Sequence, residues 1–335
     1  MGECAQVGGV IRDAASQTQT GMKLVLVTAV VLSAFTNWAP AATYSYPAAS
    51  EEMYAFELLN SERSHCGFGP LRQSAELDSA AKSHAAWLFF NNAQGHMQRP
   101  GTPGFTGVAP WDRVITADYG PDFSFESTEV QVFHSGIEQG SGAHAVRSLL
   151  NAPYHLVNML RGYREVGIGV KEKIDLGLMN NNQNIVNIVL AAKNSEGFQV
   201  EQAAALRTYP CEGSVGMVRS LRHETPNPFP GRDLFAHPVG ASIAVVAGAG
   251  KILSISSASV VNAKTGASVP ILAPVTGLID RNATAENKIV EDNEGFISTS
   301  NPLEANTLYQ VNLTGTLGAT SFSRRFTFTT GGVKF

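Results

Sequence analysis

The chain has 335 residues, of which 44% are hydrophobic and 16% charged, and its formal net charge is −4. This composition excludes a disordered chain, and the length favours two domains over one. The basic residues are scattered and form no cationic stripe, so nucleic acid is excluded as the expected partner.

The N-terminal residues predict export. Residues 22–41 contain one Lys, an apolar run from Leu24 to Phe35, and small residues at their end. This pattern is typical of a secretory signal peptide and is too short for a stable membrane span, although an uncleaved anchor is the alternative. Residues 1–21 have neither apolar periodicity nor basic targeting character, and we interpret them as a mis-assigned N-terminal extension. The mature protein is therefore expected to be secreted, periplasmic or at the cell envelope.

Two cysteines, Cys66 and Cys211, remain after the predicted signal peptide. In an exported protein two cysteines favour a disulfide, which here would join the first helix of a domain to the segment that leaves it. Two unpaired thiols are the alternative.

The first domain begins with helical patterns. Apolar residues at helical spacing predict a helix over residues 50–66, with Ser50 as its N-cap, and a second helix over residues 74–91. Residues 95–110 are rich in Gly and Pro, which predicts a long loop, and loops of this length are usually functional or mobile. A third helical pattern covers residues 143–160.

β-Branched residues cluster after the third helical pattern. Residues 165–172 and 184–192 predict strands of a central sheet, so residues 50–200 are expected to form an α+β domain. Residues 201–234 combine Pro, Gly and polar residues without a sustained period, which predicts a linker. Short β-forming runs between turns then predict an all-β sandwich over residues 235–332.

Two histidines and two glutamates form the candidate site. His96 opens the Gly- and Pro-rich loop, and His155 lies 59 residues later among apolar neighbours. Glu126 and Glu129 lie between them. Two imidazoles and a carboxylate that converge in a cleft can ligate zinc, and they can also simply hydrogen-bond one another. The residues around His155 do not by themselves distinguish a core histidine from a cavity histidine.

Five segments recur in the order in which they occur in a known family. They are LLNSERSHCGFGPLRQSAELDSAAKSHAAWL, GHMQRPGTPGF, WDRV followed by YG, STEVQVF, and LLNAPYHLVNMLRGYREVGIGV. Over about residues 51–200 the chain resembles the CAP superfamily of cysteine-rich secretory, venom-allergen and plant defence proteins, and within it the bacterial branch. The C-terminal segments PLEANTLYQVNLTG and SRRFTFTTGG resemble the last strands of bacterial immunoglobulin-like modules.

The CAP resemblance implies a three-layer α-β-α sandwich, followed here by an immunoglobulin-like β-sandwich. It also implies a surface cavity lined by two histidines and two acids, in some members with a divalent metal. His96 and His155 match the two histidine positions. Glu129 matches the first acid, and Glu126 is its competitor.

The second acid of that set is missing at its expected position. Ala152 stands there, and Asn151 is the only nearby polar substitute. The resemblance implies that His96 and His155 are the metal ligands, and that zinc binds more weakly than at a site with two carboxylates. Arg113 also matches a recurrent family position, at which its guanidinium is expected to pin the long loop through hydrogen bonds rather than to bind an anion.

These features support two hypotheses of function. The first is a secreted binding or adhesion module whose cavity holds a small apolar or glycan-like ligand or a cell-envelope component, with the β-sandwich as spacer or adhesion surface. The second is a zinc-dependent hydrolase, protease- or esterase-like, in which Glu129 acts as base toward a zinc-polarised water. A purely structural envelope protein is a third reading that requires no site.

Overall fold

The computed structural model describes residues 44–120, 123–135, 141–172, 183–199, 206–284 and 288–332. The predicted N-terminal extension and signal peptide lie outside these residues. Within the described ranges, no helix combines the length and the apolar character needed to cross a membrane. We refer to residues 44–199 as the N-terminal part and to residues 206–332 as the C-terminal part.

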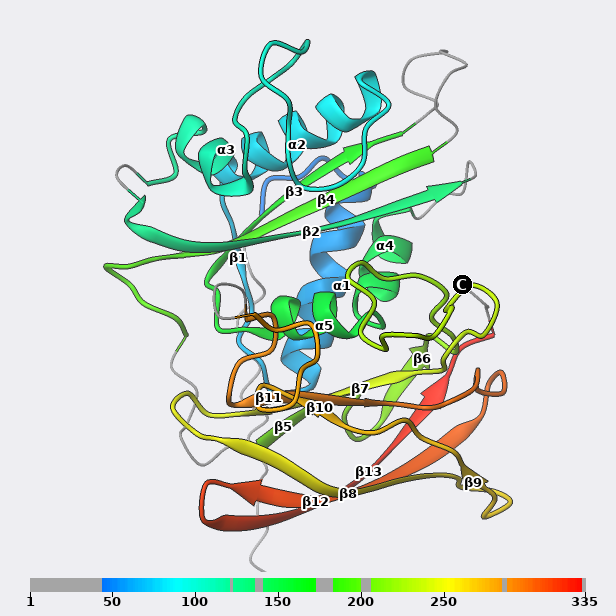
Figure 1. Ribbon diagram of the computed structural model, residues 1–335. Coiled ribbons are helices and arrows are strands. Elements are labelled where there is room, and N and C mark those ends of the chain that lie inside the picture. The colour runs from blue at the N-terminus through cyan, green and yellow to red at the C-terminus, as the bar shows by residue number, and fades with distance from the viewer. Residues whose placement is uncertain are drawn as a thin grey trace, which may run out of the picture. The chain divides into compact units, whose positions relative to one another are not determined.

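A four-stranded sheet lies in the middle of the N-terminal part (Figure 1). Its strands are, in chain order, β1 (Arg72–Gln73), β2 (Phe125–Ser135), β3 (Glu165–Lys171) and β4 (Gln183–Lys193). Their order in the sheet is β1-β3-β4-β2, with β1 parallel to β3 and the other neighbours antiparallel. Because β2 is the last strand in this order, it has a neighbour on one side only among the described strands.

Helices cover both faces of this sheet (Figure 1). They are α1 (Glu51–His65), α2 (Ala75–Phe90), α3 (Pro110–Thr116), α4 (Ser141–Leu149) and α5 (Pro153–Leu160). Helices α2 and α3 lie on one face, and α1, α4 and α5 lie on the other. This arrangement confirms the predicted three-layer α-β-α fold.

The first two helices begin where the sequence places a serine cap. The Ser50 hydroxyl accepts a hydrogen bond from the Met53 amide at 3.1 Å, and the Ser74 hydroxyl accepts one from the Leu77 amide at 3.3 Å. A serine oxygen at this position satisfies an amide that has no partner within the helix. The predicted helices over residues 50–66 and 74–91 therefore agree closely with α1 and α2.

Helix α2 packs directly onto the backbone of β3. An added Cβ at Gly167 would lie 2.0 Å from the Leu77 carbonyl carbon, and one at Gly169 would lie 2.4 Å from that of Ala81. Only glycine permits this approach, because any side chain would push the helix away from the sheet. The close contact fixes the first half of α2 against the sheet, and the loop that carries His96 follows the other end of this helix.

The single helix predicted over residues 143–160 is wrong, because the chain breaks into α4 and α5. Pro153 occupies the first position of α5, and Ala152 before it is extended, with φ −87° and ψ 111°. A proline disfavours a helical conformation of the preceding residue, so α4 cannot continue through it. The break places His155 in the first turn of α5 rather than in the middle of a long helix.

The C-terminal part is a sandwich of two sheets. Its strands are β5 (Leu206–Tyr209), β6 (Ser214–Met217), β7 (Ser242–Ala247), β8 (Leu253–Asn262), β9 (Ser268–Val269), β10 (Val275–Thr276), β11 (Glu294–Ser298), β12 (Leu308–Leu317) and β13 (Thr320–Thr330). We call the sheet β10-β11-β7-β5 the inner sheet and β6-β13-β12-β8-β9 the outer sheet. The predicted all-β fold of this part is confirmed, and its immunoglobulin-like character stays a prediction.

Two strands of the sandwich lie within the segment for which a linker is predicted. Strand β5 pairs with β7 in the inner sheet, and β6 pairs with β13 in the outer sheet. Each has four residues. Runs this short between Pro and Gly residues show no period in the sequence, and only pairing with a distant partner makes them strands. The ordered sandwich thus includes residues before 235.

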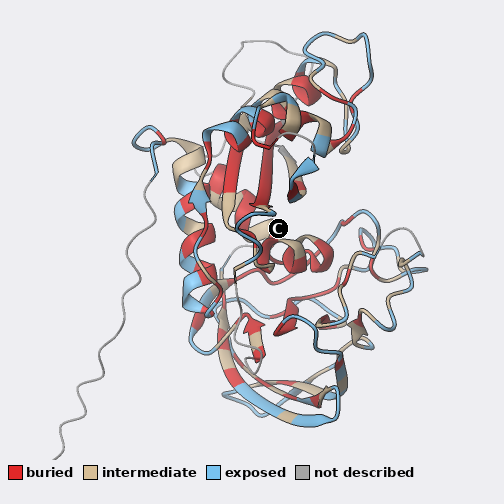
Figure 2. Ribbon diagram, turned by 90° about the vertical axis from the view of Figure 1, so that its left-hand side faces the viewer, coloured by how far each residue is buried: buried red, intermediate tan, exposed pale blue. Residues whose placement is uncertain are grey.

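The two parts of the chain pack against each other through α5. This helix contacts β7 and β11 of the inner sheet, and hydrophobic residues of both parts form one continuous buried cluster. Figure 2 shows buried residues on α5 and on the central strands of the first sheet. Arg161, directly after α5, forms a bidentate pair with Glu294, with both N–O distances 2.8 Å. The hydroxyl of Tyr154 donates to Asp280 at 2.6 Å.

A disulfide provides a covalent link between the same two parts. Cys66 follows α1, and Cys211 lies between β5 and β6, 145 residues later in the chain. The bond agrees with the prediction from the cysteine count. It ties the end of a helix in the N-terminal part to the strands that begin the sandwich.

Replacing both Cys66 and Cys211 with Ser should lower the free energy of unfolding by about 4 to 5 kcal/mol, because the disulfide closes a long loop and restricts the unfolded chain. The measurement is urea unfolding of the wild type and the double variant at pH 7. A loss below about 1 kcal/mol would show that the disulfide adds little to the shared hydrophobic core.

The substitution Arg161→Ala should cost about 3 kcal/mol, because it leaves the buried Glu294 carboxylate without its cationic partner. The matched control is Arg72→Ala, which removes an exposed pair with Glu165 and Glu196 and should cost at most about 1 kcal/mol. Urea unfolding of both variants checks this difference. Equal losses would contradict a larger contribution of the buried Arg161–Glu294 pair than of the exposed Arg72 pair.

Candidate functional site

The cavity that contains both predicted histidines has a volume of about 580 Å³. It lies beside the edge of β2 that has no neighbouring strand among the described residues, where the loop after α2, the turn between α4 and α5, and residues 218–225 meet. Its polar lining includes Gln94, His96, Gln131, Asn151, His155 and Glu224, and its apolar lining includes Val132, Phe133, Leu149, Ala152 and Leu221. This volume is within the usual range for small-molecule sites. A larger cavity of about 760 Å³, between loops of the C-terminal part, contains none of the predicted site residues.

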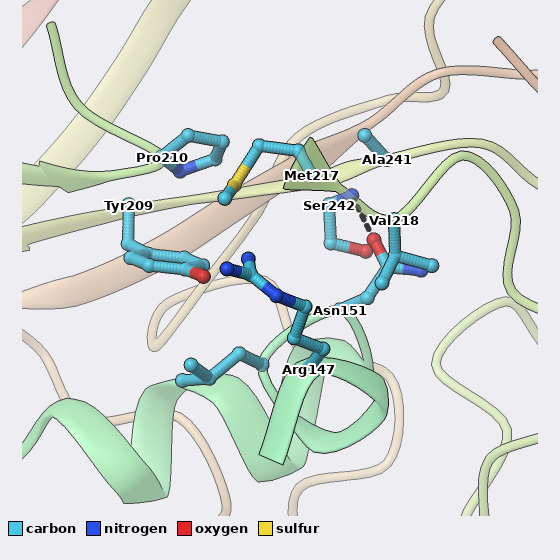
Figure 3. Close-up of a pocket in the computed structure, with 9 residues that line it drawn as sticks. Arg147, Asn151, Tyr209, Pro210, Met217, Val218, Ala241 and Ser242 are labelled. Atoms are coloured by element: carbon cyan, nitrogen blue, oxygen red, sulfur yellow. Dashed lines mark hydrogen bonds between the residues drawn. The ribbon is translucent and has the colours of Figure 1, made fainter. Parts of the chain in front are cut away.

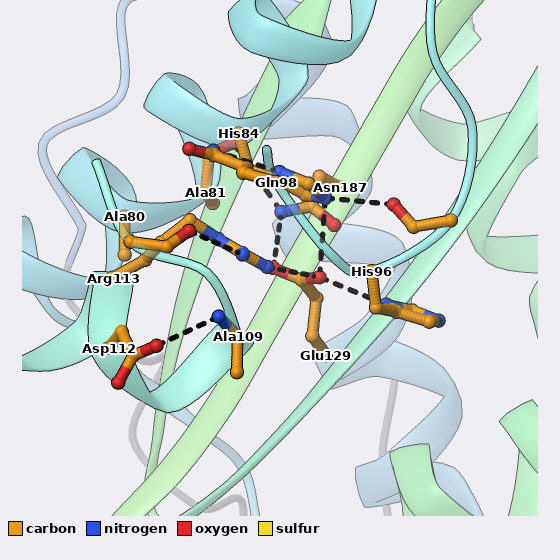
Figure 4. A network of polar contacts seen from close by, with 12 residues as sticks. Ala80, Ala81, His84, His96, Gln98, Ala109, Asp112, Arg113, Glu129 and Asn187 are labelled. Carbon is orange, nitrogen blue, oxygen red and sulfur yellow. Dashed lines mark hydrogen bonds and ion pairs between the residues drawn. The ribbon is translucent and has the colours of Figure 1, made fainter. Parts of the chain in front are cut away.

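His96 stands at the rim of this cavity with 40% of its side chain exposed. Its Nδ1 lies 2.9 Å from Oε1 of Glu129 on β2. The ring therefore has its Nδ1 side held by a carboxylate, and its Nε2 side is turned away from that carboxylate (Figure 4).

Glu129 lies behind His96 in a buried polar network (Figure 4). Its side chain is only 1% exposed. Arg113 Nη2 donates to both of its carboxylate oxygens, at 2.7 and 2.8 Å, and Asn187 Nδ2 donates to Oε2 at 3.1 Å. The other terminal nitrogen of Arg113 reaches the carbonyl oxygens of Gly107 and Val108, at 3.5 and 3.4 Å. Arg113 thus pins the long loop, as expected from the sequence.

The network keeps the Glu129 carboxylate ionised. Burial by itself would raise the pKa of Glu129, but the hydrogen bond from His96 and the positive charge of Arg113 outweigh it and lower the pKa to about 2. A carboxylate with so low a pKa takes up a proton poorly, and this one is already occupied by three donors. Glu129 is therefore poorly suited to act as a general base.

His84 belongs to the same network and is fully buried. Its Nδ1 accepts a hydrogen bond from Gln98 Nε2 at 3.1 Å, because the Gln98 carbonyl oxygen is already bonded to the Thr106 amide. Its Nε2 consequently carries the proton and donates to the Gly95 carbonyl oxygen at 3.2 Å. Burial lowers the pKa of His84 to about 4. His84 is thus a neutral core histidine on the buried face of α2.

His155 lies in the first turn of α5 and is paired with Glu224. Its Nδ1 lies 2.9 Å from Glu224 Oε1, and the side chains are 16% and 0% exposed. The same oxygen accepts the backbone amides of Tyr154 at 2.8 Å and of His155 at 3.2 Å. Glu224 therefore caps α5 in place of Ala152, whose side chain makes no cap bond.

Sequence reasoning missed Glu224. It lies 69 residues after His155, within the segment for which a linker is predicted, and no motif or period surrounds it. Only the packing of residues 218–225 against α5 brings the two side chains together. The absence of an acid at Ala152 is the one feature of the sequence that could have prompted a search for a carboxylate elsewhere.

Of the remaining candidates, Glu126 does not line the cavity, and Asn151 lines it but is bonded to backbone groups. Glu126 is exposed on β2, three residues from Glu129 and so on the opposite face of the strand. Asn151 is buried, and its amide joins the two parts of the chain: Nδ2 donates to the Ser220 carbonyl oxygen at 3.2 Å, and Oδ1 accepts the Ser242 amide at 3.1 Å. Figure 3 shows Asn151 beside Ser242 at this junction.

The histidines and carboxylates of the cavity do not fit a catalytic zinc site. Among the described residues, no group of three or more His, Cys, Asp or Glu side chains is placed to hold a metal ion. A catalytic zinc usually has three protein ligands. The carboxylates of Glu129 and Glu224 contact the Nδ1 atoms of the two histidines, so they orient the rings rather than complete a ligand set.

Stability should fall as the pH is lowered, in two overlapping windows. His84 stays neutral in the folded protein down to a pKa of about 4, whereas an unfolded histidine binds a proton near pH 6.5. Glu129 stays ionised down to a pKa of about 2, against 4.5 for a free glutamate. Each contribution to the free energy of unfolding is complete above the pKa of the group in the unfolded chain. It is lost as the pH falls toward the pKa of the group in the folded protein, by about 3 kcal/mol for each group.

Urea unfolding at pH 7.5, 5.5, 4 and 3 measures this loss. The exposed carboxylate of Glu126 provides the control, since Glu126→Gln should leave the pH dependence unchanged. A free energy of unfolding that stays constant between pH 7.5 and 3 would contradict the assigned states of His84 and Glu129.

One of the comparisons with known proteins, the match to a family model, agrees with the fold. The family described as "CAP: Cysteine-rich secretory protein family" matches residues 56–177. Among curated proteins no sequence matches. A similar solved structure is the 1.5 Å crystal structure of an extracellular protein containing an SCP domain from Bacillus anthracis str. Ames. That alignment has 18% identity and a TM-score of 0.30, and it covers 42% of this chain and 40% of the other.

At so low an identity and TM-score, that neighbour supports no inference about the site. The family match extends from within α1 to beyond β3, and this stretch includes His96, Glu129 and His155. The chain therefore contains, over residues 56–177, a CAP domain of the cysteine-rich secretory protein family.

Proposed function

We propose that this protein is an exported binding module whose CAP cavity holds a small glycan-like ligand. One observation carries the proposal: His96 and His155 line the same cavity, and each has its Nδ1 held at 2.9 Å by a buried carboxylate. This arrangement leaves both Nε2 atoms for contact with a ligand.

The chemistry of the lining favours a ligand that donates hydrogen bonds. A neutral imidazole whose Nδ1–H is given to a carboxylate has an acceptor at Nε2. Gln131 also lines the cavity and adds an amide group. Hydroxyl groups can donate to the Nε2 acceptors. The apolar side chains of Phe133 and Leu149 also line the cavity and can pack against a sugar ring.

The cysteine and leader patterns support export. Residues 22–41 have the pattern of a secretory signal peptide, and Cys66 and Cys211 form a disulfide. Disulfides persist in oxidising compartments and are rare in the cytosol. The description of the matched family as secretory is in agreement.

The geometry does not favour the alternative, a zinc-dependent hydrolase with Glu129 as base. The Glu129 side chain is 1% exposed, is held by Arg113 through both oxygens, and has a pKa of about 2. A general base needs access to the water that it deprotonates and a pKa closer to the working pH.

Isothermal titration with chitotetraose tests the proposal. Binding to the wild type should weaken at least tenfold in the His96→Ala, His155→Ala double variant, because both Nε2 acceptors are removed. The matched control is His65→Ala, an exposed histidine that does not line the cavity, and its affinity should equal that of the wild type.

Parallel titrations with zinc chloride and with palmitate define the opposing outcomes. Micromolar zinc binding that the double variant loses, without chitotetraose binding, would replace the glycan proposal by a metal site. Palmitate binding that the double variant retains would indicate an apolar ligand in contact with Phe133 and would also overturn the glycan proposal.

A further inference from the structure

One wall of the cavity comes from outside the CAP match. Residues 218–225 contribute Ser220, Leu221 and Glu224 to the lining, whereas the family match ends at residue 177. In this chain the cavity is therefore built partly by the CAP domain and partly by a segment that lies beyond the family match in the sequence.

The sandwich holds this wall in place. Leu221 pairs with Val239 through two backbone hydrogen bonds, at 2.8 and 3.2 Å. Arg219 Nη1 donates to the Leu303 carbonyl oxygen at 3.1 Å, and the Ser220 carbonyl oxygen accepts from Asn151 at 3.2 Å. Residues 218–225 thus have anchors on both sides, in the sandwich and at the end of α4.

Each of the two histidines is paired with a glutamate, but the two glutamates belong to different parts of the chain. Nδ1 of His96 faces Glu129, which belongs to the CAP domain, and Nδ1 of His155 faces Glu224, which does not. Glu224 reaches α5 beside Ala152, the position at which the CAP resemblance places the missing acid. The wall therefore supplies a carboxylate where the CAP domain of this chain lacks one.

The state of Glu224 indicates a role other than stability alone. Its Oε1 accepts three hydrogen bonds, whereas its Oε2 is buried and has no partner among the described residues. Burying a carboxylate with an unsatisfied oxygen is costly, and a serine at the N-cap would satisfy α5 amides without that cost. Costly groups of this kind are retained mainly at functional sites.

We propose that Glu224 is a positioning residue that completes the CAP site: it holds His155 as the Nδ1–H tautomer, so that Nε2 faces the cavity as an acceptor for a ligand hydroxyl. The inference rests on the proposed function for the identity of the ligand. The orientation of His155 is independent of any ligand.

The first experiment reads the tautomer of His155 in the full chain without ligand. Long-range ¹H–¹⁵N correlation spectra at pH 8, where a free imidazole is neutral, report which ring nitrogen carries the proton. The wild type should show Nδ1–H. The variant Glu224→Ala should shift to the Nε2–H form that a solvated imidazole favours, and Glu224→Gln should keep Nδ1–H because its amide oxygen still accepts.

A second variant separates positioning from helix capping. In the double variant Ala152→Ser, Glu224→Ala, the serine hydroxyl can cap α5 but offers no carboxylate to His155. Its thermal stability should recover toward that of the wild type, while the Nε2–H tautomer persists and chitotetraose affinity stays at least tenfold weaker. Glu224→Gln should bind within about threefold of the wild type, because geometry rather than charge is required.

The outcomes distinguish this inference from the proposed function. If Glu224→Ala keeps the Nδ1–H form, or if the serine double variant regains full affinity, Glu224 is a structural cap and the inference fails while glycan binding stands. If the wild type binds no chitotetraose, the proposed function fails, and the tautomer spectra still decide the role of Glu224. Glu126→Gln, on the opposite face of β2, should change neither readout.

Discussion

The burial of α5 between two sheets is the constraint on which the cavity depends. This short helix contacts β2 of the first sheet on one side and β7 and β11 of the inner sheet on the other. Arg161 and Tyr154 fix it with polar contacts to the C-terminal part. Because α5 is held on both sides, its first turn has one position relative to residues 218–225, and His155 meets Glu224 there. The two parts therefore act as one body at the site.

Two carboxylate–imidazole pairs give the cavity its chemical character. Glu129 orients His96, and its carboxylate oxygens also accept hydrogen bonds from Arg113 and Asn187. The carboxylate is therefore not available for proton transfer. Glu224 holds His155 from the other wall. Each ring is oriented by a group behind it, which is how binding sites gain precision without mobile side chains. This division of roles fits a binding site better than a hydrolytic one.

The network around Glu129 also links the site to the stability of the fold. The same carboxylate accepts from an arginine that pins the long loop and from an asparagine on β4, so the loop, the sheet and His96 are joined through one buried charge. A buried charge is stable only when its partners are complete. Substitutions that disturb this network are therefore expected to affect folding and the cavity together.

The sequence by itself determined the three-layer fold, the disulfide, and the two histidines of the cavity. Capping serines, apolar periods and β-branched runs act through near neighbours, so they predict the individual helices and strands. The disulfide follows from the cysteine count, and the three-layer arrangement and the two histidines follow from the resemblance of the CAP segments. Only the tertiary structure decided that Glu129 is a buried ion-pair partner, that Asn151 joins the two parts, and that Glu224 stands beside His155. These contacts join residues from different elements, mostly far apart in the chain, and their energies depend on burial and on partners that no local pattern records.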